Sequence, residues 1–67
     1  MALRKIARLA NAGATRAAVV YKDMDWSEFR VKFYEMIDGK LTHLVDADYH
    51  TDDKLDAFST AALVVGV

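Results

Sequence analysis

The sequence contains no cysteine and no proline, and its three glycines lie far apart. Without cysteine the fold has neither disulfides nor thiolate metal ligands, which is typical of a reducing compartment. Glycines at 13, 39 and 66 cannot form a phosphate-binding loop, and neither serine lies in a nucleophile elbow. These absences leave no catalytic signature, so we expect no enzyme, no catalytic residues and no cofactor.

The chain also lacks a long hydrophobic run. Its longest apolar stretch, near the C-terminus, is too short to cross a bilayer. The basic N-terminus lacks the apolar core of a secretory signal peptide. We therefore expect a cytoplasmic protein that does not bind membranes.

What the chain has in excess is apolar residues. They make up 54 % of its 67 residues, whereas a domain this small buries only about 60 % of its unfolded surface. Small folds usually need disulfides, a metal or a partner. With disulfides excluded, the composition predicts self-association or a partner surface, and we expect a homodimer formed through a sheet face or edge.

Charge is unevenly distributed along the chain, although the net charge is only −1. Basic residues predominate in residues 1–34 and acidic residues in residues 35–67, so the two halves could simply face each other in the fold or in a dimer. The acidic group, here called the acidic edge, is a candidate contact for a protein partner because it could imitate a phosphate backbone. It consists of Asp46, Asp48, Asp52, Asp53 and Asp56.

Nucleic-acid binding is the alternative that the basic half suggests. The candidate contacts are Arg4, Lys5, Arg8, Arg30 and Lys32. A nucleic-acid-binding domain usually has a clear basic excess, however, and this chain is slightly acidic. Protein binding is therefore the first hypothesis and nucleic-acid binding the second.

The hydrophobic pattern predicts an α+β domain over residues 14–67, a three-stranded antiparallel meander followed by one helix (β-β-β-α). Strands are expected at 16–22 and 28–37, because β-branched and aromatic residues concentrate there and alternate in the second run. Asp38-Gly39 predicts a type I′ hairpin into a third strand that ends near Tyr49. Residues 1–13 are expected to form a basic arm or a short helix over 2–10, since their apolar residues recur at helical spacing.

A helix is predicted from Asp52 to Val65. Thr51 or Asp52 would cap its start, and Gly66 stands where a helix stop is expected. Its predicted buried face consists of Leu55, Phe58, Ala62 and Val65.

The hairpin register predicts an apolar face that the helix does not cover. Pairing outward from Asp38-Gly39 places Met36 opposite Leu41 and Val31 opposite Asp46. The face left uncovered would expose apolar groups unless a second subunit or the N-terminal arm covers it. This predicted self-association face consists of Tyr34, Met36, Leu41, Val45 and Tyr49.

One set of candidate metal ligands occurs at a spacing of two residues. Asp46, Asp48, His50 and Asp52 would share one strand face if the third strand ran that far. Oxygen and imidazole ligands can bind a divalent cation, but the spacing matches neither an EF-hand loop nor a histidine zinc motif. An acidic strand end followed by a helix cap explains the same residues, so we expect no metal.

Residues 49–62, with the pattern Y-x-T-D-D-x-x-D-A-x-x-T-A, resemble a box in small proteins encoded by bacteriophages, prophages and plasmids. A strand pair with an Asp-Gly turn often precedes that box, so the resemblance covers about residues 16–65. His50 departs from the aromatic residue expected at its position. The order of elements is also similar to antitoxins of the HicB type, a likeness of fold only.

The resemblance implies an accessory protein that binds a host or phage macromolecule in the host cytoplasm. Its sharpest form is inhibition of a host factor, including CRISPR defence. The alternative is a nucleic-acid-binding accessory or antitoxin-like regulatory protein. The box is not a catalytic signature and transfers no active-site residues.

Overall fold

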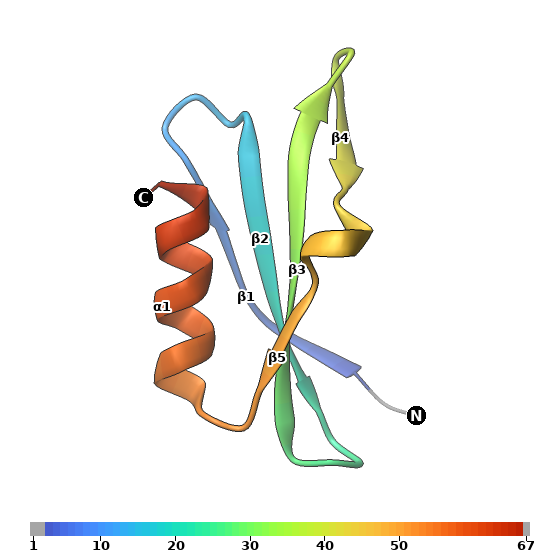
Figure 1. The fold of residues 1–67 in the computed structure, drawn as a ribbon, viewed down its shortest axis with the longest axis vertical. Helices are drawn as coiled ribbons and strands as arrows, with labels where there is room; N and C mark the ends of the chain where they lie inside the picture. Colours follow the sequence, from blue (N-terminus) through green and yellow to red (C-terminus); the bar gives the residue numbers. More distant parts are fainter. Residues whose placement is uncertain (1–2, 67) are drawn as a thin grey trace.

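The computed structural model describes residues 3–66 as one antiparallel sheet with a single helix, α1, on one side (Figure 1). The elements in chain order are β1 Leu3–Ala10, β2 Arg16–Asp23, β3 Glu28–Ile37, β4 Lys40–His43, the 3-10 helix η1 Val45–Ala47, β5 Tyr49–Thr51 and α1 Lys54–Val65. The strand order is β1-β2-β3-β4, and β5 also pairs with β3. The predicted small α+β fold is confirmed, and the three predicted strands are an undercount.

The N-terminal segment is a strand, so the helix predicted over 2–10 is wrong for its described part, Leu3–Ala10. β1 pairs with β2, but the pairing shifts by one residue at Ile6, between Lys5 and Ala7. Such an irregularity interrupts the two-residue alternation of a strand. It leaves apolar residues at spacings of three and four, which imitate a helix. Residues 1 and 2 of the predicted arm lie outside the described residues.

The β3–β4 hairpin forms at Asp38-Gly39 as predicted. Their φ angles are 50° and 80°, the two positive values that a type I′ turn requires. The predicted register holds as far as His43, which pairs with Tyr34. It is wrong beyond that point, because η1 takes the chain out of the ladder and Val31 then pairs with Tyr49 of β5.

α1 begins at Lys54, and its N-cap is Asp53 rather than Thr51 or Asp52. The Asp53 carboxylate accepts the N–H groups of Leu55 (2.9 Å) and Asp56 (3.3 Å). Gly66 ends the helix in the left-handed conformation, with a φ of 83°.

The buried face of α1 differs from the predicted one. It consists of Ala57, Ala61 and Val65, whereas Leu55 is 78 % exposed. The small alanines let the helix backbone approach the sheet closely, while Phe58 of the predicted face is partly buried and packs against the core. The contact face is therefore rotated by less than one residue position from the predicted one and shares Val65 with it. The core beneath them includes Val20, Val31 and Phe33.

The sheet has two different sides. On the helix side, α1 packs mainly against β1, β2, β3 and β5, and the β3–β4 hairpin extends past the end of the helix (Figure 1). The opposite side, here called the open face, is the side of the sheet that α1 does not cover. Cross-strand pairs such as Tyr21–Arg30 and Tyr34–His43 belong to this face.

The β2–β3 turn is fixed by Asp23, a completely buried carboxylate. It accepts the N–H groups of Asp25 (3.0 Å) and Trp26 (3.3 Å) and the Arg30 Nε–H (3.2 Å). Burial alone would raise the pKa of Asp23, but these donors outweigh it and the pKa lies below its usual value. Asp23 thus holds both the turn and Arg30 in place.

Candidate functional site

The predicted self-association face does not exist as one surface. Tyr34, Met36 and Leu41 do lie together on the open face, near the hairpin. Val45 lies in η1, and Tyr49 faces the helix side, where it packs against the core. The register change at η1 separates these last two residues from the others, so that part of the prediction is wrong.

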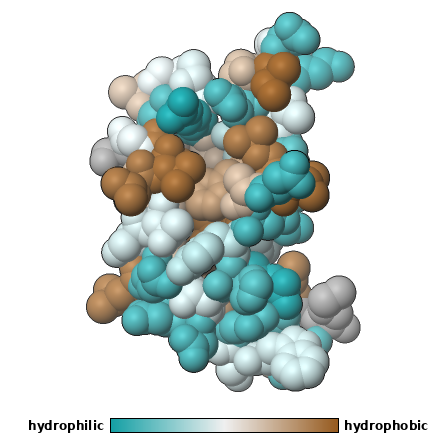
Figure 2. Space-filling model, in the orientation of Figure 1, coloured by the Kyte–Doolittle hydropathy of each residue, from teal (hydrophilic) through white to brown (hydrophobic). Residues whose placement is uncertain are grey.

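An apolar groove lies instead on the helix side, between the C-terminal end of α1 and the hairpin end of the sheet. It has a volume of about 200 Å³. Its apolar lining includes Phe33, Leu44, Val64 and Val65, and its polar lining includes Arg16 and Glu35. In Figure 2, hydrophobic surface borders a hollow in the upper half of the molecule, between α1 and the β4–η1 segment.

Apolar side chains are also exposed on the elements that border the groove. Val64, which lines the groove, is 43 % exposed, and Val45 of η1, next to the lining residue Leu44, is 68 % exposed. Leu63 is exposed too, but it lies on the outer face of α1, away from the sheet. Exposed apolar surface of this kind often marks a binding site.

The acidic edge is largely engaged within the fold. Asp53 caps α1, and Asp48 Oδ1 lies 2.7 Å from Nε2 of His43. Asp46 and Asp52 are exposed, and their side chains make no hydrogen bond or ion pair among residues 3–66. Only these two residues are free to meet a partner without loss of an internal contact.

Asp56, the last member of the acidic edge, joins α1 to β5. Its carboxylate accepts a hydrogen bond from the Tyr49 hydroxyl (2.5 Å) and another from Thr60 (3.4 Å). The bond from Tyr49, assisted by Thr51, holds the pKa of Asp56 below its usual value even though burial opposes this. The same bond, together with burial, raises the pKa of Tyr49. The pair is therefore a structural link rather than a binding site.

The basic candidates are split between the two sides of the sheet. Lys5, Arg30 and Lys32 lie on the open face, and Arg8 joins them through its pairing with Val19. Arg4 lies at the β1 edge, opposite Lys22 of β2, whose side chain covers Phe29 on the helix side. The structure thus brings four of the five predicted basic residues onto one surface.

The proposed cation ligands do not come together. η1 holds Asp46 and breaks the strand on which Asp46, Asp48, His50 and Asp52 were expected to share a face. Within residues 3–66, no three histidine, aspartate or glutamate side chains are grouped as they would be around a metal ion. In the same part of the chain, α1 is neither long nor apolar enough to cross a membrane.

Comparison with protein-family models, with curated proteins and with solved structures finds no match for this chain. Any function must therefore be argued from the surfaces themselves.

The apolar groove could not be predicted from the sequence alone. It depends on where α1 ends relative to the hairpin, which is a tertiary property. Val64 was its one local signal, because this apolar residue lines the groove but lies off the predicted buried face of the helix.

Proposed function

We propose that this chain is a non-enzymatic accessory protein that acts by protein–protein binding, and that the apolar groove is its contact surface. The observation that carries the proposal is an open apolar groove continued by exposed side chains of α1 and η1. Burying such a surface contributes roughly 25 cal/mol per Å² of apolar area. A chain this small gains stability from that burial when it binds a partner.

The first occupant of the groove is a second copy of the chain. In a two-fold contact each copy supplies the same surface, so a groove beside a projecting apolar residue is self-complementary. Val64 lines the groove and is still 43 % exposed. Arg16 and Glu35 line it with opposite charges, and neither makes an ion pair among residues 3–66. Arg16 of one copy can therefore meet Glu35 of the partner subunit.

Neither edge of the sheet is well suited to pairing with a strand of a second copy. The β1 edge contains the irregularity at Ile6 and three basic side chains, both of which discourage an incoming strand. The opposite edge is interrupted by η1 between β4 and β5. A dimer is therefore better served by the apolar groove than by either edge.

A host or phage protein is the second partner that we propose, in keeping with the accessory role that the phage box implies. Asp46 and Asp52 are its candidate contacts, because their charges are not used within the fold. The partner would present a basic surface to them.

The experiment compares two substitutions on α1 by sedimentation velocity at several protein concentrations. Val64→Asp places a charge in the wall of the groove and should shift the chain from dimer to monomer. Leu55→Asp is the matched control, since Leu55 is also exposed but lies about 14 Å away along the helix, near its N-terminus. Equal masses for the two variants would overturn the assignment of the groove as the contact surface.

A further inference from the structure

We propose that the open face of the sheet binds single-stranded nucleic acid. This surface lies on the other side of the sheet from the apolar groove, so the inference goes beyond protein binding and does not depend on it. The open face combines two tyrosines on its central strands with a group of basic side chains. Its basic members are Lys5, Arg8, Arg30 and Lys32.

Three of these cations are available to a ligand. Lys5, Arg8 and Lys32 make no ion pair among residues 3–66. Lys5 and Arg8 are exposed on β1, and Lys32 is half-buried on β3. Cations without acidic partners can replace the counterions of a phosphate backbone, which is the main source of affinity for nucleic acids.

Arg30, unlike the other three basic residues, is held by two carboxylates. Its Nε lies 3.2 Å from Asp23 and its Nη2 lies 2.9 Å from Glu28, so its charge is offset and its orientation is fixed. The side chain is still 38 % exposed. A guanidinium held in this way presents its plane to a base rather than its charge to a phosphate.

Tyrosine rings provide the stacking surface. The Nζ of Lys32 lies 5.3 Å from the centre of the Tyr21 ring, and the Tyr34 and His43 rings are 5.3 Å apart. Burial raises the pKa of Tyr34, and Tyr21 adds to this rise. Partly exposed rings next to cations are the arrangement on which proteins stack unpaired bases.

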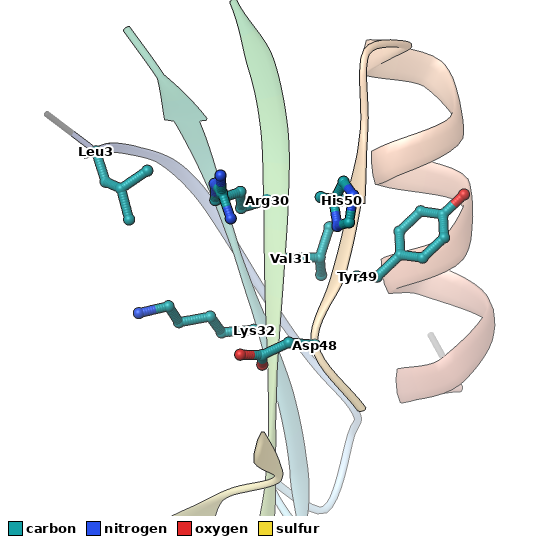
Figure 3. A pocket seen from close by; sticks show the side chains of 7 residues that line it. All are labelled: Leu3, Arg30, Val31, Lys32, Asp48, Tyr49 and His50. Atoms are coloured by element: carbon teal, nitrogen blue, oxygen red, sulfur yellow. The ribbon is translucent and has the colours of Figure 1, made fainter. Parts of the chain in front are cut away.

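A groove of about 240 Å³ lies on the same face, and Arg30 and Lys32 line it. Figure 3 shows Arg30 and Lys32 on the side of β3 that carries Leu3, whereas Tyr49 points the other way, toward α1. The groove is smaller than the ~300–1,000 Å³ pockets of drug-sized ligands, which suits a single base. Its wall also includes His50 and Asp48, whose carboxylate lies 2.7 Å from Nε2 of His43.

The acidic groups on the open face already have partners within the fold. Asp23 and Glu28 are engaged by Arg30, and Asp48 lies 2.7 Å from His43. The remaining acidic side chains lie on the helix side, in turns or in η1. A strand bound to the open face is thus separated by the sheet from the acidic first turn of α1.

The chemistry favours a single strand over a duplex. Duplex bases are stacked inside the helix, and a protein reads them by inserting an α-helix or a β-ribbon into the major groove. The single helix of residues 3–66 lies on the far side of the sheet and has acidic residues at its start. The open face offers rings to bases that are already unstacked.

The test is fluorescence anisotropy of the full chain with labelled 15-nucleotide oligo(dT) and oligo(U), titrated with salt. Three phosphate contacts predict that log K falls against log[salt] with a slope of about −2, from roughly −0.7 per contact on a single strand. Replacing Arg8 and Lys32 together by Gln should reduce the slope to about −0.7. Tyr21→Leu should weaken binding on the order of tenfold with little change in slope.

Lys32→Gln alone should weaken binding, and Lys22→Gln is its matched control. Lys22 also covers an aromatic ring, with its Nζ 5.4 Å from the Phe29 centre, but on the helix side. It should leave affinity unchanged, and circular dichroism should show both variants folded. Three results would each overturn the inference: no binding of either oligonucleotide at low salt, equal losses for the two lysine variants, or equal affinity for a duplex. Val64→Asp should retain binding, which separates this site from the dimer contact.

Discussion

Replacing Asp53 by Ala should destabilise the protein, whereas the same change at Asp52 should not. Asp53 accepts the N–H groups of Leu55 and Asp56, which otherwise have no partner within the helix. Asp52 makes no side-chain hydrogen bond among residues 3–66. The neighbouring aspartates have the same charge and both are exposed, so the comparison isolates the cap.

The expected cost is the loss of one N-cap. Substitution of an N-cap aspartate by alanine costs about 1 kcal/mol, within a range of roughly 0.5–2 kcal/mol. Unfolding entropy of about 2.1 cal/mol/K per residue over 67 residues converts 1 kcal/mol into a Tm shift of about 7 °C. Loss of the charge at the helix start affects both variants and contributes less.

The assay is thermal unfolding followed by circular dichroism at 222 nm, at one fixed protein concentration because association changes the Tm. Asp53→Ala should melt about 7 °C below the native chain, and Asp52→Ala within about 2 °C of it. Equal Tm values for the two variants would refute the assignment of the cap. The result also decides which acidic residue suits a partner-binding test, since charge reversal at Asp53 would damage the fold itself.

Two further predictions concern stability. Tyr49→Phe should flatten the pH dependence of the Tm at both ends. The lowered pKa of Asp56 adds stability that is present above about pH 3.8 and lost as the pH falls further, and the raised pKa of Tyr49 adds stability that is present below about pH 10 and lost as the pH rises further. Unchanged acid and alkaline limbs in the variant would contradict the link between β5 and α1. Gly39→Ala should lower the free energy of unfolding in urea by about 1 kcal/mol, because Gly39 has a φ of 80°. Gly13→Ala should be neutral or stabilising, because the new methyl group would make only an ordinary contact of 3.9 Å with the Thr15 methyl group. A larger loss at Gly13 than at Gly39 would contradict this reasoning.

Local signals predicted the central part of the fold. The strand at 28–37 matches β3, and the positive φ angles of Asp38 and Gly39 follow from the turn type that an Asp-Gly pair favours. The helix was also predicted, with its stop at Gly66. In each case the information lies within a few neighbouring residues, so the sequence pattern is sufficient.

The remaining features depend on contacts distant in sequence. The irregularity at Ile6 gives β1 a helix-like spacing of apolar residues, and the strand can be recognised only from its pairing with β2. η1 removed three residues from the expected ladder, so Tyr49 faces the helix side rather than the open face. The acidic edge was read as one surface from its spacing, but Asp53 and Asp56 are engaged by backbone and hydroxyl donors that spacing alone does not show.

The two proposed surfaces are compatible with each other. The apolar groove lies on the helix side and the basic, tyrosine-bearing surface on the open face. A dimer formed through the groove would leave both open faces accessible, and binding of one strand by two linked faces would raise its apparent affinity.

The most direct test of the central claim is the solution mass of the unmodified chain, measured by light scattering over a range of concentrations at low and high salt. A contact made through the apolar groove predicts a dimer of twice the 7.5 kDa chain mass that persists at high salt, because apolar burial is not screened by ions. A monomer at every concentration and salt would contradict the claim that the groove binds a second copy.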